Sequence, residues 1–120
     1  MSKLVLHIFH ADPAALATVP ALAERIHGAP QTSALEVYLF GPAEQALANP
    51  EATPEATPEA RAFNDQIDGL VKAGVRVTTC IGIAQKMGAE AAFAARGLAL
   101  ESAATAFPRF AAEGATVMSF

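Results

Sequence analysis

The segment Gly74–Gly88, GVRVTTCIGIAQKMG, decides the fold, because its pattern changes from that of a strand to that of a helix at Cys80. The run from Val75 to Cys80 is rich in branched side chains and directly follows a glycine suited to end a helix, which predicts a strand. The sequence from Ile81 to Ala95 favours helix but contains two glycines. It therefore predicts either one irregular helix or two short ones.

The upstream sequence shows the same alternation of strands and helices. Lys3 to Phe9, KLVLHIF, is apolar on both faces except at His7, as is typical of a strand covered on both sides. Leu35 to Phe40, LEVYLF, predicts a second strand. Leu98 to Ser102 and the final ATVMSF predict two more. The spacing of strand, helix and strand indicates right-handed βαβ units, and hence an α/β domain with a parallel sheet.

Capping residues and apolar periodicity predict the helices between these strands. Asp12 and Pro13 begin a helix that runs to Gly28, and Pro20 is expected to kink or split it. A short helix is expected from residue 43 to 48, and a longer one from Pro58 to Gly74. A last helix ends at Gly114, with Pro108 near its start.

Length and composition indicate a single domain over residues 1–120. The repeat PEATPEATPEA lacks large apolar side chains and places prolines where one regular helix cannot hold them. We therefore expect a flexible loop at about residues 49–57. The mean hydropathy of +0.31 is high for a small domain, which favours a homo-oligomer that buries apolar surface between subunits.

Charge and hydropathy also exclude several partners. The net charge is −4 and the eight basic residues are scattered, which argues against binding nucleic acid. No apolar stretch is long enough to cross a bilayer, and the first residues lack the pattern of a signal peptide, so we expect no membrane partner and a cytoplasmic location. Dinucleotide, P-loop, zinc and nucleophile-elbow motifs are all missing, so neither a cofactor nor a metal is expected, and whether the protein is an enzyme stays open.

Ligands and reactive groups collect beyond the carboxyl ends of the strands in an open parallel sheet. This rule selects His10 and Asp12 after the first strand, Gly41 after the second, and Cys80 and Gly82 after the third. Cys80 is the candidate reactive residue, and the other four are candidate ligand-binding residues. Three of them also have a structural explanation: His10 as an exposed turn histidine, Asp12 as a helix cap and Cys80 as a buried thiol.

Cys80 is the only cysteine, so no internal disulfide can form. We expect its thiol at the open edge of the sheet, where unpaired amides at the start of a helix favour a thiolate. The alternative is a small apolar residue packed in the core.

The succession LVLHIF, LEVYLFG, GVRVTTC and EGATVMSF, with helices between, resembles the DsrE/DsrF-like group of small proteins. The resemblance implies a three-layer α/β/α sandwich with a mainly parallel five-stranded sheet, assembled as trimers or hexamers. It further implies that Cys80 accepts sulfur as a persulfide and passes it to a partner protein. The expected function is therefore an intracellular sulfur carrier. The alternative is a small-ligand-binding or oligomeric interaction module of the same fold without catalytic activity.

Overall fold

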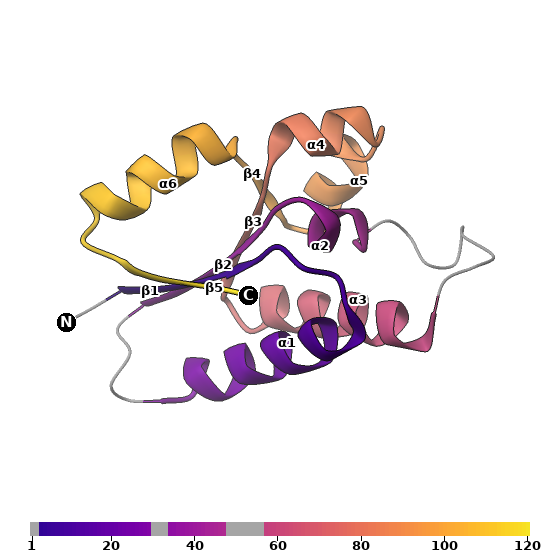
Figure 1. Cartoon of the computed structure of the whole chain (residues 1–120), viewed down its shortest axis with the longest axis horizontal. Coiled ribbons are helices and arrows are strands. Elements are labelled where there is room, and N and C mark those ends of the chain that lie inside the picture. Colours follow the sequence, from indigo (N-terminus) through magenta and orange to yellow (C-terminus); the bar gives the residue numbers. More distant parts are fainter. Residues whose placement is uncertain (1–2, 30–33, 48–56) are drawn as a thin grey trace.

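The computed structural model describes residues 3–29, 34–47 and 57–120, which form a five-stranded sheet (Figure 1). The strand order is β4-β3-β2-β1-β5, and every neighbouring pair is parallel. The strands are β1 (Lys3–Ile8), β2 (Ala34–Leu39), β3 (Arg76–Thr79), β4 (Ala99–Leu100) and β5 (Thr116–Ser119). The expected α/β class with a parallel sheet is confirmed.

Helices cover both faces of this sheet. They are α1 (Pro13–His27), α2 (Pro42–Gln45), α3 (Pro58–Lys72), α4 (Ile81–Lys86), α5 (Glu90–Ala95) and α6 (Ala103–Ala112). Figure 1 shows α1 and α3 side by side against one face, and α6 against the other. The fold is thus a three-layer α/β/α sandwich. In the part of the chain that is described, no helix has the length and apolar character needed to span a membrane.

The two long helices begin where the sequence predicts. The Asp12 carboxylate accepts a hydrogen bond from the Ala15 amide, and the Thr57 hydroxyl accepts one from the Ala60 amide. Pro20, in contrast, lies within one continuous helix, so the split expected there does not occur. Pro20 is buried, as are Leu16, Val19 and Ala23 of the same helix, and this burial offsets the hydrogen bond that proline cannot donate.

The final third agrees with one expected alternative and differs from another expectation. The segment after Cys80 forms two short helices, α4 and α5, separated by Gly88 at a φ of +66°. Helix α6 begins directly after Ser102, so the prediction that Pro108 lies near its start is wrong. The helix extends further because Ala106 contributes a buried side chain one turn before Phe110. The predicted loop at 49–57 lies outside the described residues except for Thr57, which caps α3.

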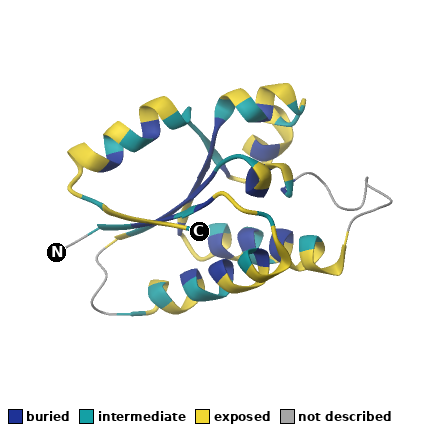
Figure 2. Ribbon diagram, viewed as in Figure 1, coloured by how far each residue is buried: buried dark blue, intermediate teal, exposed yellow. Residues whose placement is uncertain are grey.

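Side chains alternate between two apolar clusters on opposite faces of the strands. The cluster facing α1 and α3 includes Leu6, Ile8, Val37, Leu39, Phe63 and Ile67. The cluster facing α6 consists of Val5, Tyr38, Cys80, Ala106 and Phe110, with partly buried side chains around it. Figure 2 shows the central strands buried and the outer surface of α6 exposed. Helix α6 therefore forms the cover over the face on which Cys80 lies.

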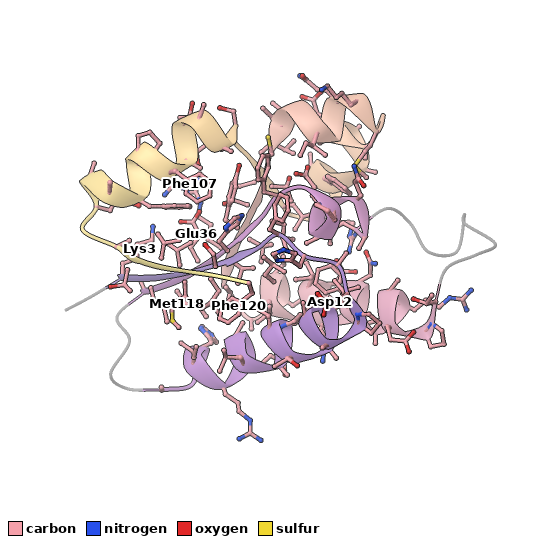
Figure 3. All side chains as sticks on the ribbon, in the orientation of Figure 1. Lys3, Asp12, Glu36, Phe107, Met118 and Phe120 are labelled. Atoms are coloured by element: carbon pink, nitrogen blue, oxygen red, sulfur yellow. The ribbon has the colours of Figure 1, made fainter. Side chains whose placement is uncertain are left out.

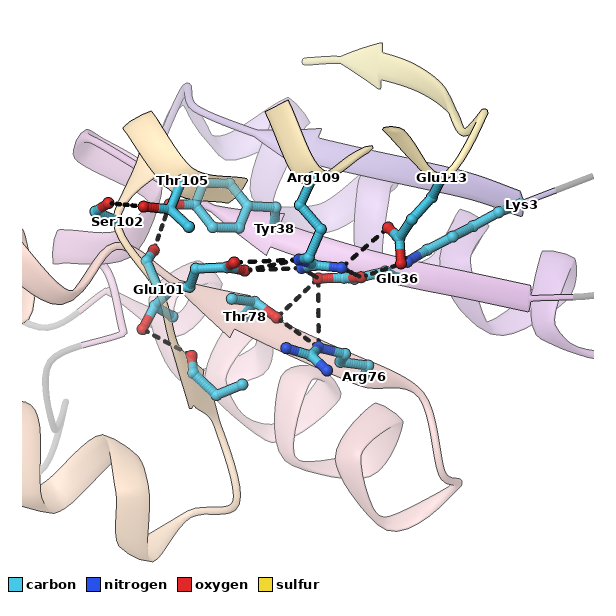
Figure 4. A network of polar contacts seen from close by, with 12 residues as sticks. Lys3, Glu36, Tyr38, Arg76, Thr78, Glu101, Ser102, Thr105, Arg109 and Glu113 are labelled. Atoms are coloured by element: carbon cyan, nitrogen blue, oxygen red, sulfur yellow. Dashed lines mark hydrogen bonds and ion pairs between the residues drawn. The ribbon is translucent and has the colours of Figure 1, made fainter. Parts of the chain in front are cut away.

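A buried carboxylate on the same face holds α6 in place (Figure 4). Glu36 of β2 is only 1% exposed, and Arg109 of α6 donates to both of its oxygens, at 3.2 and 2.7 Å. Lys3 and Thr78 donate to the same carboxylate at 2.9 Å each. Burial alone would raise the pKa of Glu36, but these donors outweigh burial and hold the pKa below its ordinary value.

Arg109 extends this network along α6. It donates to Glu101, just beyond β4, at 2.8 Å, and to Glu113 at 3.0 Å. Its guanidinium lies 4.8 Å from the centre of the Phe110 ring. Hydrogen bonds to Glu36 and Glu101 raise the pKa of Arg109, which keeps it charged. One side chain thereby links α6 to β2 and to the end of β4.

We expect Glu36→Gln to lower the free energy of unfolding at neutral pH by about 2 kcal/mol or more, because Arg109 and Lys3 lose a buried counter-charge. The pKa of Glu36 is depressed by folding, so its stabilisation is present above the ordinary value of 4.5 and is lost as the pH falls through the folded-state value. The difference in the free energy of unfolding between wild type and Glu36→Gln should therefore shrink as the pH is lowered from neutral to acidic, as measured by urea unfolding.

The matched control is Glu113→Gln, which alters an exposed carboxylate of the same network. It should change stability much less than Glu36→Gln does. Equal losses from the two variants, or a Glu36→Gln difference that does not depend on pH, would contradict the account.

Candidate functional site

Cys80 directly follows β3 and is the N-cap residue of α4, as the sequence predicts. Its side chain is only 7% exposed and belongs to the apolar cluster beneath α6. The expectation that the thiol lies at an open edge is therefore wrong. The reason is that Cys80 belongs to the apolar cluster that Tyr38 of β2 and Ala106 and Phe110 of α6 also form.

A fully buried carboxyl group holds the backbone of Cys80. Glu44 of α2 is 0% exposed, and its Oε1 accepts a hydrogen bond from the Cys80 amide at 3.0 Å. The carbonyl of Leu39 shares that amide at 3.3 Å. The Cys80 amide is therefore already bonded, and α4 has only six residues, so the start of this helix offers little of the expected support for a thiolate.

The second oxygen of Glu44, Oε2, is buried and has no hydrogen-bond partner among the described residues. Burial raises the pKa of Glu44 to about 7, although the hydrogen bond from the Cys80 amide opposes this shift. The carboxyl group is therefore present in both protonation states near neutral pH. A group of this kind can accept and release a proton at the Cys80 site, which we define as Cys80, Glu44 and Tyr38.

Tyr38 of β2 is the third member of the Cys80 site. Its hydroxyl is buried and donates to the carbonyl of Glu101 at 2.8 Å (Figure 4). Burial raises the pKa of Tyr38, and interaction with Cys80 and the charge of Glu44 add to the shift. The phenol therefore stays neutral. Because the Tyr38 hydroxyl donates its hydrogen bond to the Glu101 carbonyl, its oxygen is available to accept a hydrogen bond from the Cys80 thiol.

Aromatic rings surround these polar groups. Phe107 of α6 meets Tyr38 edge-on, with ring centres 5.5 Å apart, and lies between α6 and the strands (Figure 3). It also meets His7 edge-on at 5.1 Å. His7 contacts the Ser119 hydroxyl through Nδ1 at 3.0 Å, while its buried Nε2 has no partner among the described residues. Burial, with a contribution from His10, lowers the pKa of His7, so the imidazole is neutral at pH 7.

The two candidates after β1 lie at the same edge of the sheet but outside this cluster. His10 is exposed, and its amide donates to the carbonyl of Phe120 at 3.2 Å. Asp12 is also exposed, and its carboxylate caps α1 beside the Ala15 amide (Figure 3). Their roles as ligand-binding residues remain predictions. None of the hydrogen bonds found in residues 3–29, 34–47 and 57–120 joins either side chain to Cys80.

The two candidate glycines differ in what their positions require. Gly41 has a φ of +67°, and a Cβ there would collide with the Phe9 ring, so backbone geometry and close packing both demand glycine. Gly82 is exposed in α4 and has open space where a Cβ would lie. Gly82 is thus the position where a side chain can be added to test ligand approach without disturbing the fold.

Sequence reasoning missed Glu44 and Tyr38. Glu44 lies in the first turn of the helix that begins at Pro42. An acidic residue there ordinarily stabilises the N-terminus of a helix while staying exposed, so neither its type nor its position indicated burial. Tyr38 is the only tyrosine, and it lies in the mostly apolar run of the second predicted strand. That combination could have marked it, because a buried tyrosine hydroxyl needs a partner.

Over the described ranges, no group of three or more His, Cys, Asp or Glu side chains is arranged to hold a metal ion. The Cys80 thiol and the Tyr38 phenol share one buried cluster, and the buried Glu44 carboxyl is bonded to the Cys80 backbone, so water has little access to these groups. A thiol can react as a nucleophile once a neighbouring group takes its proton.

Comparison with known proteins identifies the architecture. The chain matches no family model and no curated protein. Its fold is similar to the structure of a conserved protein of unknown function, BT1422, from Bacteroides thetaiotaomicron. The two chains are 12% identical, the match covers 99% of this chain and 95% of the other, and the TM-score is 0.78. A similarity at this level of identity establishes a shared fold and carries no activity with it.

Proposed function

We propose that this protein is a cytoplasmic sulfur carrier that accepts sulfur as a persulfide on Cys80. One observation carries the proposal: Cys80 lies just beyond a strand end, and its backbone is bonded to a buried carboxyl group whose other oxygen has no partner among the described residues. A cysteine that only fills space needs no such neighbour, and burying a carboxyl group without full hydrogen bonding costs free energy. The resemblance of the chain to DsrE/DsrF-like proteins supports the same function.

The proposed reaction moves one sulfur atom without net oxidation. The Cys80 sulfur attacks the outer sulfur of a donor persulfide, R–S–SH, after losing its proton. A bond forms between the two sulfurs while the donor's S–S bond breaks, and the donor leaves as a thiolate that takes up a proton. The products are Cys80–S–SH and R–SH. Attack by an acceptor thiolate on the outer sulfur then passes the atom on and restores the Cys80 thiol.

The burial of Cys80 sets a condition on this chemistry. Because the thiol is buried in a cluster that α6 helps to form, a donor can reach it only when α6 or other surrounding side chains move. The covering helix is held largely through Arg109, whose partners lie at the sheet surface. Covering the thiol also protects a loaded persulfide from water and reductants between the two transfers.

The test is intact mass spectrometry after incubation with glutathione persulfide. Wild type should gain one sulfur atom, which a reducing agent removes, while Cys80→Ser gains none because the chain has no other cysteine. The fold should tolerate this variant, since serine is close to cysteine in size. A wild-type protein that gains no sulfur, although its thiol is reduced and intact, would refute the proposal, as would equal loading of Cys80→Ser.

We also propose that the chain forms a homo-oligomer through β5. All four residues of β5 are exposed, and the strand lies at the edge of the sheet (Figure 2). The exposed large apolar side chains of the described residues are Phe9, Val117 and Met118, all on β5 or at the end of the neighbouring β1. The strand lacks the charged or proline residues that usually protect a free edge. This edge equally supports the alternative of an interaction module.

The assembly prediction concerns mass in solution. Light scattering after gel filtration should give wild type a mass above the 12.4 kDa of one chain. Placing lysines at Val117 and Met118 should yield the monomer, because the charges oppose burial of this edge. The control is Ala91→Lys on the exposed surface of α5, which should leave the oligomer intact. A wild-type monomer would contradict the proposal.

A further inference from the structure

We infer that Glu44 is the group that accepts the proton of the Cys80 thiol and so sets the pH range in which Cys80 reacts. The inference deepens the proposed function and rests on it. The Glu44 carboxyl is bonded to the backbone of the same residue whose thiol must ionise, at 3.0 Å from the Cys80 amide nitrogen to Oε1. Its other oxygen has no partner in the described structure and is free to take a proton.

Burial explains why an internal acceptor is needed. If the thiol lost its proton to solvent beside a carboxylate, the dry site would hold two negative charges, which repel and are poorly solvated. If the proton moves to Glu44, the site still holds one negative charge, which passes from oxygen to sulfur. The thiolate therefore forms without an added charge beneath α6.

The other ionisable groups around the pair do not replace Glu44 in this role. Tyr38 from β2 stays protonated and donates to a carbonyl, and His7 from β1 is directed to Ser119 through Nδ1. Glu101, beyond β4, is bonded to Arg109. Arg96, after α5, pairs with Asp68, and none of the ion pairs found among the described residues involves Glu44. Glu44 is thus the uncompensated carboxyl nearest the Cys80 backbone.

The pKa of Glu44, raised to about 7 by burial, fits this assignment. A proton acceptor works best when its pKa lies near the working pH, because it is then ionised often enough and still basic enough. An ordinary carboxylate would be a much weaker base towards a thiol, whose unperturbed pKa is about 8.5.

The experiment measures the rate of Cys80 alkylation by iodoacetamide from about pH 5 to pH 10, a range that brackets both groups. In wild type the rate should rise through a step near pH 7, where Glu44 becomes ionised. In Glu44→Gln that step should vanish, leaving a rise only around or above the ordinary thiol pKa. At neutral pH the variant should react more slowly, because no internal group accepts the thiol proton. Glutamine keeps an oxygen for the Cys80 amide, so the backbone contact can persist.

Glu90→Gln, on the exposed surface of α5, is the matched control and should reproduce the wild-type profile. A Glu44→Gln variant that keeps the step near pH 7, or reacts faster than wild type at neutral pH, would overturn the inference. So would a wild-type profile without that step, a result that holds even if the variant does not fold.

Alkylation requires no sulfur donor, so this experiment and persulfide loading fail independently. Persulfide loading without a pH step near 7 would refute the role of Glu44 but support the function as a sulfur carrier. A pH step near 7 without persulfide loading would refute the function as a sulfur carrier but support Glu44 as the acceptor of the thiol proton.

Discussion

The ion pair between Glu36 and Arg109 is the interaction on which the rest of the structure depends. The Glu36 carboxylate is only 1% exposed, and the Arg109 guanidinium donates hydrogen bonds to both of its oxygens. This bidentate pair fixes α6 over one face of the sheet. Apolar contacts alone would let a short helix slide, whereas paired buried charges penalise every position in which they separate. With α6 fixed, Ala106 and Phe110 complete the buried cluster that contains Cys80.

The site follows from this constraint combined with the topology of the sheet. Parallel strands deliver Tyr38 and Cys80 to the same face near the same edge, and the turn after β2 brings Glu44 to the Cys80 amide. Each contact is ordinary by itself. Together they place a thiol, a carboxyl of raised pKa and a neutral phenol in a region with little water. Sulfur transfer is the chemistry we propose for this combination.

The strands, the long helices and their starts could be predicted because their causes are local. Asp12 and Thr57 cap the helices that follow them, and apolar patterns identify the covered strands. The site could not be predicted to the same extent. The position of Cys80 after its strand is a local property, but its burial depends on α6, which lies far along the chain. Glu44 looks like an acid at a helix start, and only tertiary packing buries it.

Access to the thiol links the ion pair to the proposed chemistry, and native-state labelling of Cys80 with a thiol reagent at low urea tests this link most directly. If local movement of α6 exposes the thiol, labelling should depend only weakly on urea and should be faster in Glu36→Gln than in wild type. The account would be contradicted if labelling showed the full urea dependence of global unfolding in both proteins. Cys80 would then react only in the unfolded chain.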